Sequence, residues 1–316
     1  MGVEVHVLTV DPKYASYNPI DVTLVEEINE NIRVHRTRTW EPMRLYQKLV
    51  GKKNIPAAGF ANTDSQSRLQ RLANFIRSNF FIPDPRKGWK KYALVKAKQV
   101  IHDHNIDCII TSSPPHSTQL IGLELKKTIN VKWLCDLRDP WTDIYYYDLL
   151  NHSNWSHNKN LKLEKIILHE ADQLITVSNG LEELFKAKLN NNEWSKISII
   201  PNGYDSNDFE RFNYQFINDA FTISYIGTMS DQYQVEPFLD AFKNFIANKN
   251  DKKILLRFVG SVSSKIQNYI KKIEIERQCE FIGSVSHQKA IGYLEQSDCV
   301  LLVIPDVSNN KGITTG

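Results

Sequence analysis

The chain has 316 residues and a formal net charge of +3; 41 % of its residues are hydrophobic and 24 % are charged. This balance is typical of a globular protein, and the length allows two domains of ordinary size. So small a net charge does not indicate nucleic-acid binding, and no apolar stretch reaches the roughly 18 residues that would favour a membrane-spanning helix.

Short β-branched runs alternate with amphipathic stretches of helical length along the whole sequence. Strands are predicted at 3–10, 107–112, 131–137, 173–178, 197–201, 221–227, 254–260, 279–283 and 298–304. Helices are predicted near 66–80, 89–104, 117–129, 159–171, 179–189, 234–248, 263–277 and 287–296. The alternation predicts an α/β fold with parallel sheets covered by helices on both faces. Right-handed crossovers would bring the loops after the strands to one edge, where such sheets bind ligands.

A domain boundary is predicted near residue 212. The segment "IPNGYDSNDFERFNYQF" is rich in turn residues and has little apolar periodicity. The β-α alternation restarts after it with "FTISYIGTM" at Phe221. We therefore predict two Rossmann-like domains, residues 1–212 and 213–316, which face each other across a cleft.

The segment "DLRDPWTD" directly follows a predicted strand and carries Asp136, Arg138, Asp139 and Asp143. Three interpretations stay open. The carboxylates could bind a divalent cation, although an arginine between them makes this costly. Arg138 could bind a carboxylate or phosphate with two parallel hydrogen bonds. The third interpretation is an Arg–Asp pair that only holds the loop together.

Three further polar segments follow predicted strands. In "TSSPPHSTQLIG", serines can cap the next helix, whose N-terminus attracts anions, and His116 lies beside it. Ser178 is a predicted helix cap after strand 173–178, and Asn202 and Gly203 form a turn after strand 197–201. Neither G-x-G-x-x-G nor a P-loop signature is found, which disfavours dehydrogenases and P-loop enzymes.

Residues 66–100 are strongly basic. They hold nine cationic side chains against a single acid, Asp84, with aromatic residues between them. The cationic residues are Arg68, Arg71, Arg77, Arg86, Lys87, Lys90, Lys91, Lys96 and Lys98. One interpretation is a helix pair with solvated charges, and the other is a surface that contacts anionic lipid.

The four cysteines indicate the compartment. Cys108, Cys135, Cys279 and Cys299 each lie in or beside an apolar run and form no C-x-x-C pair. We interpret them as buried thiols of a reducing, cytoplasmic environment.

The order of several stretches resembles a known family. "ADQLITVS", "KISIIPNGYDSNDF", "ISYIGTM", "RFVGSV", "EFIGSV" and "SDCVLLVIP" follow one another as in glycosyltransferase family 4 enzymes of the GT-B fold. "FIPDPRKGW", "TSSPPHSTQLIG", "DLRDPW" and "NNKGITTG" are similar to a bacterial branch that makes surface polysaccharides. The resemblance covers nearly the whole chain and rests on the ordered set, not on any single motif.

The resemblance implies an acceptor-binding N-terminal domain, a donor-binding C-terminal domain, a nucleotide-diphosphate sugar as donor, a carbohydrate or lipid-linked acceptor, and retention at the anomeric carbon. It implies no cofactor and no obligatory metal. "DLRDPW" lies where the family commonly has His-Asp; Arg138-Asp139 stands there, so an imidazole role is not carried over. Arg138 is the candidate for charge stabilisation, with Asp139 and His116 orienting hydroxyls.

The donor-binding candidates are Gly227, Thr228, Gly283, Lys311, Ser178, Asn202 and Gly203. Gly227 matches the glycine that begins the family's donor-phosphate loop. The arginine and lysine that many members place after it are not found in "GTMSDQYQVEP". The resemblance also places a first strand and helix before Met1 and paired glutamates after Gly316, so residues 1–316 alone are not expected to turn over.

Two rival functions are considered. A nucleotide-sugar epimerase of the same architecture would act on the donor without an acceptor. A non-catalytic nucleotide- or sugar-binding module would bind without forming product. The expected location is cytoplasmic; if residues 66–100 contact anionic lipid, the protein is peripheral on the inner membrane face.

Overall fold

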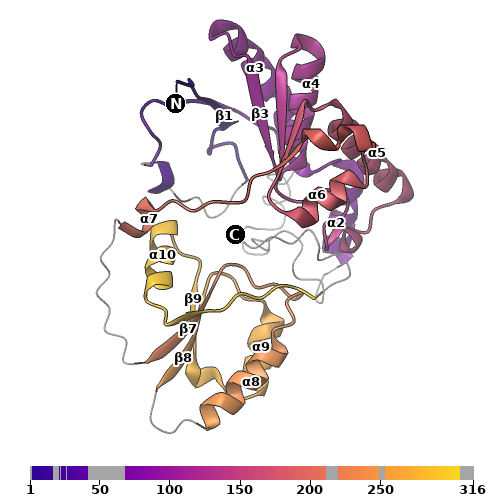
Figure 1. Ribbon diagram of the computed structural model, residues 1–316. Helices are drawn as coiled ribbons and strands as arrows, with labels where there is room; N and C mark the ends of the chain where they lie inside the picture. Colours follow the sequence, from indigo (N-terminus) through magenta and orange to yellow (C-terminus); the bar gives the residue numbers. More distant parts are fainter. Residues whose placement is uncertain are drawn as a thin grey trace.

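The computed structural model describes residues 2–16, 21, 23–25, 27–41, 68–210, 220–248 and 253–306. It is an α/β protein whose described strands all pair in parallel, with helices packed around the sheets (Figure 1). The α/β prediction is therefore confirmed. None of the described helices is long and apolar enough to cross a bilayer.

The N-terminal half contains two groups of strands. β1 (His6–Val10) pairs with β2 (Arg33–Thr37), and a separate sheet has the order β3 (Cys108–Ser113), β4 (Lys132–Leu137), β5 (Gln173–Thr176) and β6 (Ile197–Ile199). The helices of the N-terminal half are α2 (Arg68–Phe80), α3 (Lys90–Asp103), α4 (Gln119–Ile129), α5 (Asn154–Glu170) and α6 (Asn179–Lys186). Short 3₁₀ turns cover Thr23–Val25, Pro85–Trp89, His116–Thr118, Tyr147–Leu150 and Asn191–Lys196.

The C-terminal half is built on one sheet of order β10-β7-β8-β9. Its elements are β7 (Phe221–Ile226), α8 (Glu236–Ala247), β8 (Ile254–Val259), α9 (Ser264–Lys272), a 3₁₀ turn (Glu276–Gln278), β9 (Cys279–Gly283), α10 (His287–Glu295) and β10 (Cys299–Val300), and the short α7 (Asn207–Glu210) precedes them on the N-terminal side of the predicted boundary. β6 and β7 belong to different sheets; the predicted boundary at residue 212 lies outside the described residues.

The N-terminal half differs from the single sheet that was expected. Among the described residues, β1 and β3 share no backbone hydrogen bond, and the two strand groups are joined through α3, which contacts both β1 and β2. Leu8 of β1 and Ile109 of β3 pack on the same apolar cluster as Ala93 and Ala97 of α3. A shared helix face thus holds the two groups together by apolar burial.

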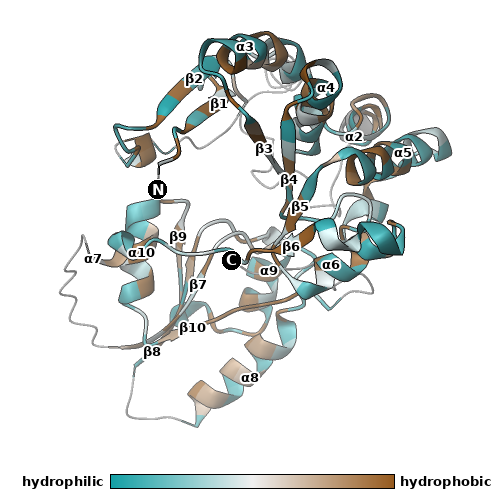
Figure 2. Cartoon of the chain, turned by 45° about the horizontal axis from the view of Figure 1, so that its top comes forward, coloured by the Kyte–Doolittle hydropathy of each residue, from teal (hydrophilic) through white to brown (hydrophobic). Residues whose placement is uncertain are grey.

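Each half has its own hydrophobic core, and Figure 2 shows apolar residues along the strands that form it. In the N-terminal half the fully buried Trp133 on β4 donates from its indole nitrogen to Thr111 Oγ1 at 2.7 Å. This packing depends on Gly122 of α4, because a Cβ there would lie 2.2 Å from the indole nitrogen. In the C-terminal half, Leu256 and Phe258 of β8 are fully buried.

The two halves touch at α10, which contacts α7 and the 3₁₀ turn at Thr23–Val25. The backbone N–H of His287, the first residue of α10, donates to Asp21 Oδ2 at 2.6 Å, and its Nε2 lies 3.0 Å from Asp208 Oδ2. Two carboxylates from the N-terminal side therefore meet the positive end of this helix.

The cysteines are free thiols, as expected, but their burial differs. Cys135 is buried, Cys108 and Cys279 are partly buried, and Cys299 is exposed. The prediction of burial is wrong at Cys299, because β10 is a two-residue strand at the edge of its sheet.

Candidate active site

The loop after β4 is organised around an ion pair. Asp136, at the carboxyl end of β4, accepts hydrogen bonds from Ser112 Oγ at 2.7 Å and from Arg138 Nε at 3.0 Å. The Asp136 side chain is 11 % exposed and that of Arg138 is 57 % exposed. The terminal nitrogens of Arg138 make no hydrogen bond to any residue that the structure describes. The pair thus anchors the base of the guanidinium and leaves its outer face available to an anion.

Gln119 fixes the ends of β3 and β4 against each other. Its buried amide nitrogen donates to the carbonyl oxygens of Thr111 and Asp136 and to Ser113 Oγ, at 3.2, 2.9 and 2.9 Å. Because the amide satisfies both strand ends, the loop that carries Arg138 starts from a rigid position.

Asp139 lies among tyrosines. Burial raises the pKa of its carboxyl group above the usual value. Burial also raises the pKa of Tyr146 to about 12, with the nearby Asp139 charge adding to the effect. Asp139 therefore sits in a partly desolvated place, where a hydrogen bond to a ligand hydroxyl is stronger than in water.

His116 begins the 3₁₀ turn after β3 and stacks on Trp141, with ring centroids 4.8 Å apart and planes 11° from parallel. Its Nδ1 is buried and has no hydrogen-bond partner among the residues that the structure describes. Burial, aided by the charge of Lys188, lowers the pKa of His116 to about 3. The imidazole is therefore neutral near pH 7 and acts there only as a hydrogen-bonding or stacking group.

Asp143 does not join the other carboxylates of this loop. It forms an ion pair with Lys188, which also contacts Glu164 Oε1 at 2.8 Å and Thr142 Oγ1 at 3.0 Å. Asp136 is likewise paired, with Arg138. Within the described residues, the structure brings these aspartates into no common metal-binding group.

Asp84 is a site-building residue that the sequence analysis did not single out. Its carboxylate accepts from the backbone N–H of Ser117 at 2.7 Å, from Ser117 Oγ at 2.8 Å and from the backbone N–H of Arg86 at 2.9 Å. The buried carboxylate, not a serine, thus caps the turn that carries His116. Burial raises its pKa, while the Ser117 hydrogen bonds oppose the rise.

In the C-terminal half, three adjacent strands end in glycines with positive φ. Gly227 follows β7 with φ +139°, Gly260 follows β8 with φ +118°, and Gly283 ends β9 with φ +78°. The N–H of Gly227 donates to Val259 O, and that of Gly260 donates to Gly283 O, both at 2.8 Å. We call these three residues the glycine edge.

Gly260 is the most constrained member of the glycine edge, because a Cβ there would lie 2.1 Å from Gly227 O. Sequence analysis found Gly227 and Gly283 and missed Gly260. The repeat "YIGTM", "FVGSV" and "FIGSV" would have identified it, since each copy places a glycine and a hydroxyl residue after an apolar run.

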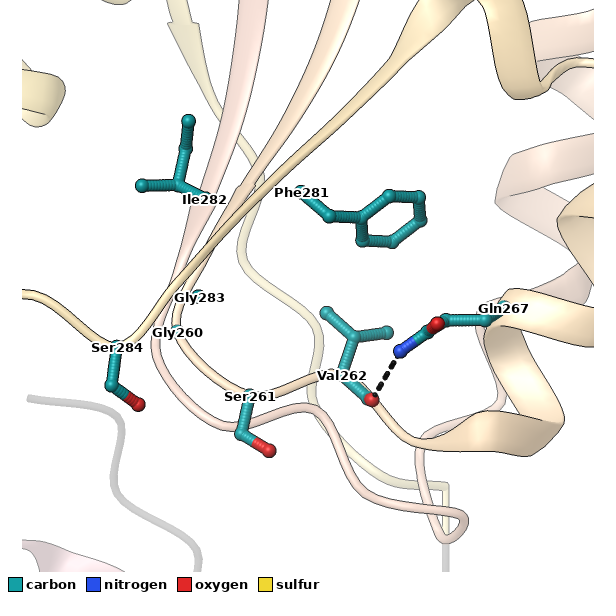
Figure 3. A pocket seen from close by; sticks show the side chains of 8 residues that line it. All are labelled: Gly260, Ser261, Val262, Gln267, Phe281, Ile282, Gly283 and Ser284. Carbon is teal, nitrogen blue, oxygen red and sulfur yellow. Dashed lines mark hydrogen bonds between the residues drawn. The ribbon is translucent and has the colours of Figure 1, made fainter.

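A hollow of about 350 Å³ opens beside the glycine edge. It is lined by Gly260, Ser261, Val262, Gln267, Phe281, Ile282, Gly283 and Ser284. Figure 3 shows the Ser261 and Ser284 side chains just beyond the strand ends, with Phe281 and Gln267 on the far side. Exposed hydroxyls and closely approachable backbone next to an apolar wall suit a ligand with polar oxygens and a flat apolar part.

Tyr145, in the loop after β4, lies close enough to Tyr233, in the loop after β7, for their charges to interact. Burial raises the pKa of Tyr145, and the neighbouring Tyr233 and Asp139 add to the rise. Burial raises the pKa of Tyr225 in the same way, with Tyr233 and Tyr145 contributing, and its hydroxyl donates to Thr228 O at 3.0 Å. Tyr145 of the N-terminal half therefore lies near the loop that begins at Gly227.

The other predicted donor residues are scattered. Thr228 is exposed directly after Gly227. Ser178 caps α6 by accepting from the backbone N–H of Leu181, as predicted. Asn202 and Gly203 are exposed in the segment between β6 and α7. Lys311 lies outside the described residues.

Solved structures with a similar arrangement of strands and helices identify the fold. The crystal structure of Anabaena HepE in complex with UDP is similar with a TM-score of 0.52 at 14 % identity, covering 94 % of this chain and 73 % of that chain. Weaker likenesses include a mutant of S. aureus TarM in complex with Fondaparinux, alpha-GlcNAc-glycerol and UDP (TM-score 0.49, 11 % identity, 72 % of this chain and 41 % of that chain). Another is UDP-GlcNAc 2-epimerase from Methanocaldococcus jannaschii (TM-score 0.44, 11 % identity, 94 % and 78 %). The fold is that of a GT-B glycosyltransferase, with two parallel-sheet halves.

Family profiles give the assignment. Residues 1–208 match the profile described as Glycosyltransferase Family 4, and residues 206–305 match Glycosyl transferases group 1. The chain belongs to glycosyltransferase family 4. No curated protein matches it.

Proposed function

We propose that the protein transfers a sugar from a nucleotide-diphosphate donor to a carbohydrate or lipid-linked acceptor, with retention at the anomeric carbon and without an obligatory metal. The observation that carries the proposal is the glycine edge beside its hollow, in a family 4 glycosyltransferase chain. The UDP in the HepE complex supports a nucleoside diphosphate as the ligand class.

The donor binds in the C-terminal half. The glycine edge lets phosphate oxygens approach the backbone, and the exposed Thr228, Ser261 and Ser284 offer hydroxyl donors to them. Lys311 adds a positive charge from the segment that follows. The apolar wall at Phe281 faces the base or ribose.

Charge on the leaving diphosphate is met by Arg138. Its guanidinium is held at Nε by Asp136 and is exposed at its outer nitrogens, which suits two parallel hydrogen bonds to a phosphate. Stabilisation of the leaving group by prearranged donors is a large part of catalysis of this kind. Asp139 and the neutral His116 orient sugar or acceptor hydroxyls.

The acceptor is carried on an anionic membrane surface, to which the N-terminal half binds through α2. Leu72, Phe75, Ile76 and Phe80 of this helix are 56, 46, 41 and 62 % exposed, and their i, i+3, i+4, i+8 spacing places them on one face. Exposed cations of the same basic segment include Arg71, Lys91 and Lys98. Arg71 lies on α2 itself, whereas Lys91 and Lys98 lie on α3. An apolar helix face with a cation on the same helix is the pattern of an interfacial helix.

The function is tested with the full-length gene product, a panel of nucleotide sugars and a panel of saccharide and lipid-linked acceptors. The nucleotide sugar that raises the melting temperature most is chosen first, because a ligand that binds only the native state stabilises it. Release of nucleoside diphosphate should require an acceptor, and the product's anomeric configuration, read by NMR, should match that of the donor.

Two results would contradict the proposal. Conversion of the donor to its C2 epimer without acceptor would make the protein an epimerase. Saturable donor binding with no product from any acceptor, under conditions where the melting temperature responds to donor, would make it a binding module.

A further inference from the structure

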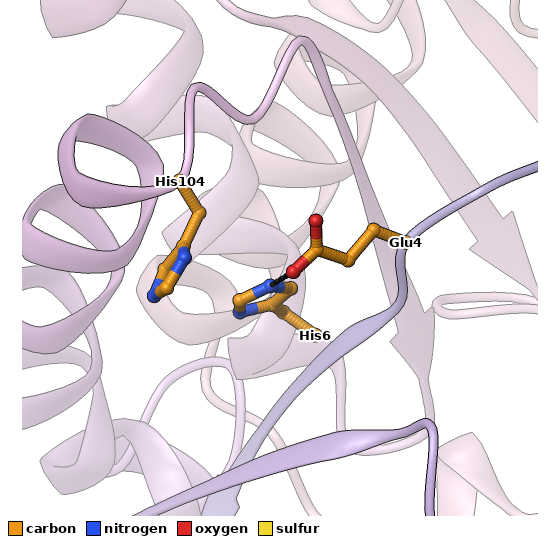
Figure 4. A group of neighbouring side chains, drawn as sticks. All are labelled: Glu4, His6 and His104. Atoms are coloured by element: carbon orange, nitrogen blue, oxygen red, sulfur yellow. Dashed lines mark hydrogen bonds and ion pairs between the residues drawn. The ribbon is translucent and has the colours of Figure 1, made fainter.

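Four polar side chains converge at the amino end of β1, on the opposite edge from the candidate active site. Glu4 precedes β1, His6 begins it, His35 lies on β2, and His104 is the C-cap residue that follows α3. Figure 4 shows Glu4, His6 and His104 turned toward one another. One ligand atom from each of these three lies within 4.8 Å of the others. We call the four residues the histidine cluster.

The potential metal-ligand atoms of the cluster lie close together. His6 Nε2 is 3.1 Å from Glu4 Oε1, and the His6 and His104 ring centroids are 4.2 Å apart. The His6 side chain is only 5 % exposed, whereas that of Glu4 is 56 % exposed. The His6 imidazole therefore lies on the buried side of the cluster, and the Glu4 carboxylate lies on its solvent side.

A cation already bridges two of these donors. Arg33 Nη1 lies 3.1 Å from Glu4 Oε1 and 3.2 Å from His104 Nδ1. The guanidinium thus uses the carboxylate oxygen and the imidazole lone pair that a metal ion would use. Arg33 comes from the surface strand β2 and its side chain is 56 % exposed, so it can turn into solvent without leaving an unpaired buried charge.

His35 supplies a partner behind the cluster. Its Nε2 is 3.0 Å from His6 Nδ1, and the two rings stack with planes 14° apart. In the tautomer where His6 Nδ1–H donates to His35, the His6 Nε2 lone pair faces Glu4 Oε1, 3.1 Å away. Metal-ligating histidines almost always donate their other ring N–H in this way, which orients the ring.

We propose that Glu4, His6 and His104 bind one divalent transition-metal ion of the zinc class, with His35 as the hydrogen-bond partner of His6. Two imidazoles and one carboxylate are ligands that Zn²⁺ accepts, and three protein ligands leave a position for water. The site has a structural role: it fastens the start of β1 to the end of α3, two elements separated by about a hundred residues of chain. It is separate from the donor site, which lies at the carboxyl ends of other strands.

The alternative is a hydrogen-bonded cluster whose permanent cation is Arg33. The two differ in the effect of removing Arg33. If Arg33 competes with a metal for Glu4 and His104, then Arg33→Met, which keeps the chain length and removes the charge, strengthens metal binding. If the guanidinium belongs to the cluster, the same change only weakens the fold and creates no ion site.

The experiment is calorimetric titration of Zn²⁺ into the EDTA-treated, dialysed protein without an affinity tag, with far-UV circular dichroism as the folding check. We expect one saturable site in the wild type and at least tenfold tighter binding in Arg33→Met. His104→Gln, at the half-buried residue that follows α3, should abolish the site, and His35→Phe should weaken it by about 10- to 100-fold. The matched control is His102→Gln, which removes a histidine two residues away whose ring pairs with Asp103.

Three results would overturn the site. The first is no saturable Zn²⁺ binding in either wild type or Arg33→Met. The second is binding that His104→Gln leaves unchanged, which would assign the ion to other side chains. The third is equal loss in His104→Gln and His102→Gln, which would indicate unspecific binding by surface histidines. Because His104→Gln and Arg33→Met act in opposite directions, a general loss of folding cannot imitate the expected pattern.

Discussion

Gly260→Ala tests whether the glycine edge requires glycine. An alanine at φ +118° stores backbone strain of about 1–3 kcal/mol. Its Cβ would also lie 2.1 Å from Gly227 O, and relieving such overpacking costs about 1–3 kcal/mol more. The free energy of unfolding should therefore fall by about 2–6 kcal/mol, a large part of the roughly 5–15 kcal/mol that holds a domain together.

Two other glycines separate the two causes. Gly283 has φ +78° and open space around its Cβ position, so Gly283→Ala should cost strain alone, about 1–2 kcal/mol. Gly203 has open space and no positive φ, so Gly203→Ala should change stability by no more than about 0.5 kcal/mol. The expected order of destabilisation is Gly260, then Gly283, then Gly203.

Urea unfolding followed by two probes can locate the effect. All six tryptophans lie at or before residue 194, so tryptophan fluorescence reports the N-terminal half, whereas far-UV circular dichroism reports both halves. In Gly260→Ala the dichroism transition should move to lower urea than in the wild type, whereas the fluorescence transition should move less. A Gly260→Ala midpoint equal to that of Gly203→Ala would refute the account of the glycine edge.

Three further predictions concern the N-terminal half. Arg138→Lys should lose most turnover with an unchanged dichroism spectrum, because an ammonium cannot reproduce the planar fork; near-wild-type kcat would remove Arg138 from the site. His116 has a pKa of about 3 when folded and 6.5 ordinarily, so the unfolded chain takes up its proton first, and the wild type should lose stability as pH falls from 6.5 toward 3. His116→Phe should flatten that dependence in urea midpoints measured from pH 7 to pH 4, and an unchanged slope would contradict the burial of the imidazole. Sedimentation with anionic vesicles should fall as salt shortens the Debye length below about 8 Å, and Leu72→Ser with Phe75→Ser should reduce it; equal binding to neutral vesicles would exclude the electrostatic contribution.

Much of the fold follows from local pattern. Each predicted strand and helix with a strong apolar period is present, with ends moved by a few residues. β2 was missed because Arg33, His35 and Arg36 interrupt the apolar pattern. Five residues of this composition predict a loop as readily as a strand. α5 begins at Asn154, five residues before the predicted start, because Ser153 caps it by accepting from Ser156 N–H. Ser153 could be recognised in the sequence as a cap, but no helical spacing of apolar residues begins directly after it.

The candidate site was less accessible to sequence reasoning, because its contacts join distant residues. Asp84 caps Ser117 across 33 positions, and nothing near either residue indicates the pairing. The approach of Tyr145 to Tyr233 depends on how the two halves are placed, which no local pattern encodes. Arg138 was found because charge directly after a buried strand is visible locally. Its pairing with Asp136 was one of three open interpretations, and the structure shows that pair together with an exposed outer face.

The close fit of Gly122 under Trp133 has a consequence for how this sequence can diverge. A Cβ at position 122 would lie 2.2 Å from the indole nitrogen, so no other residue enters α4 there while Trp133 keeps its place. The two positions are therefore coupled, and Gly122 cannot be replaced while Trp133 is retained. Among relatives as distant as 14 % identity, we expect a side chain at the position of Gly122 to be accompanied by a smaller residue at that of Trp133. Substitution there should be inherited as a pair, with the tryptophan lost before, or together with, the glycine.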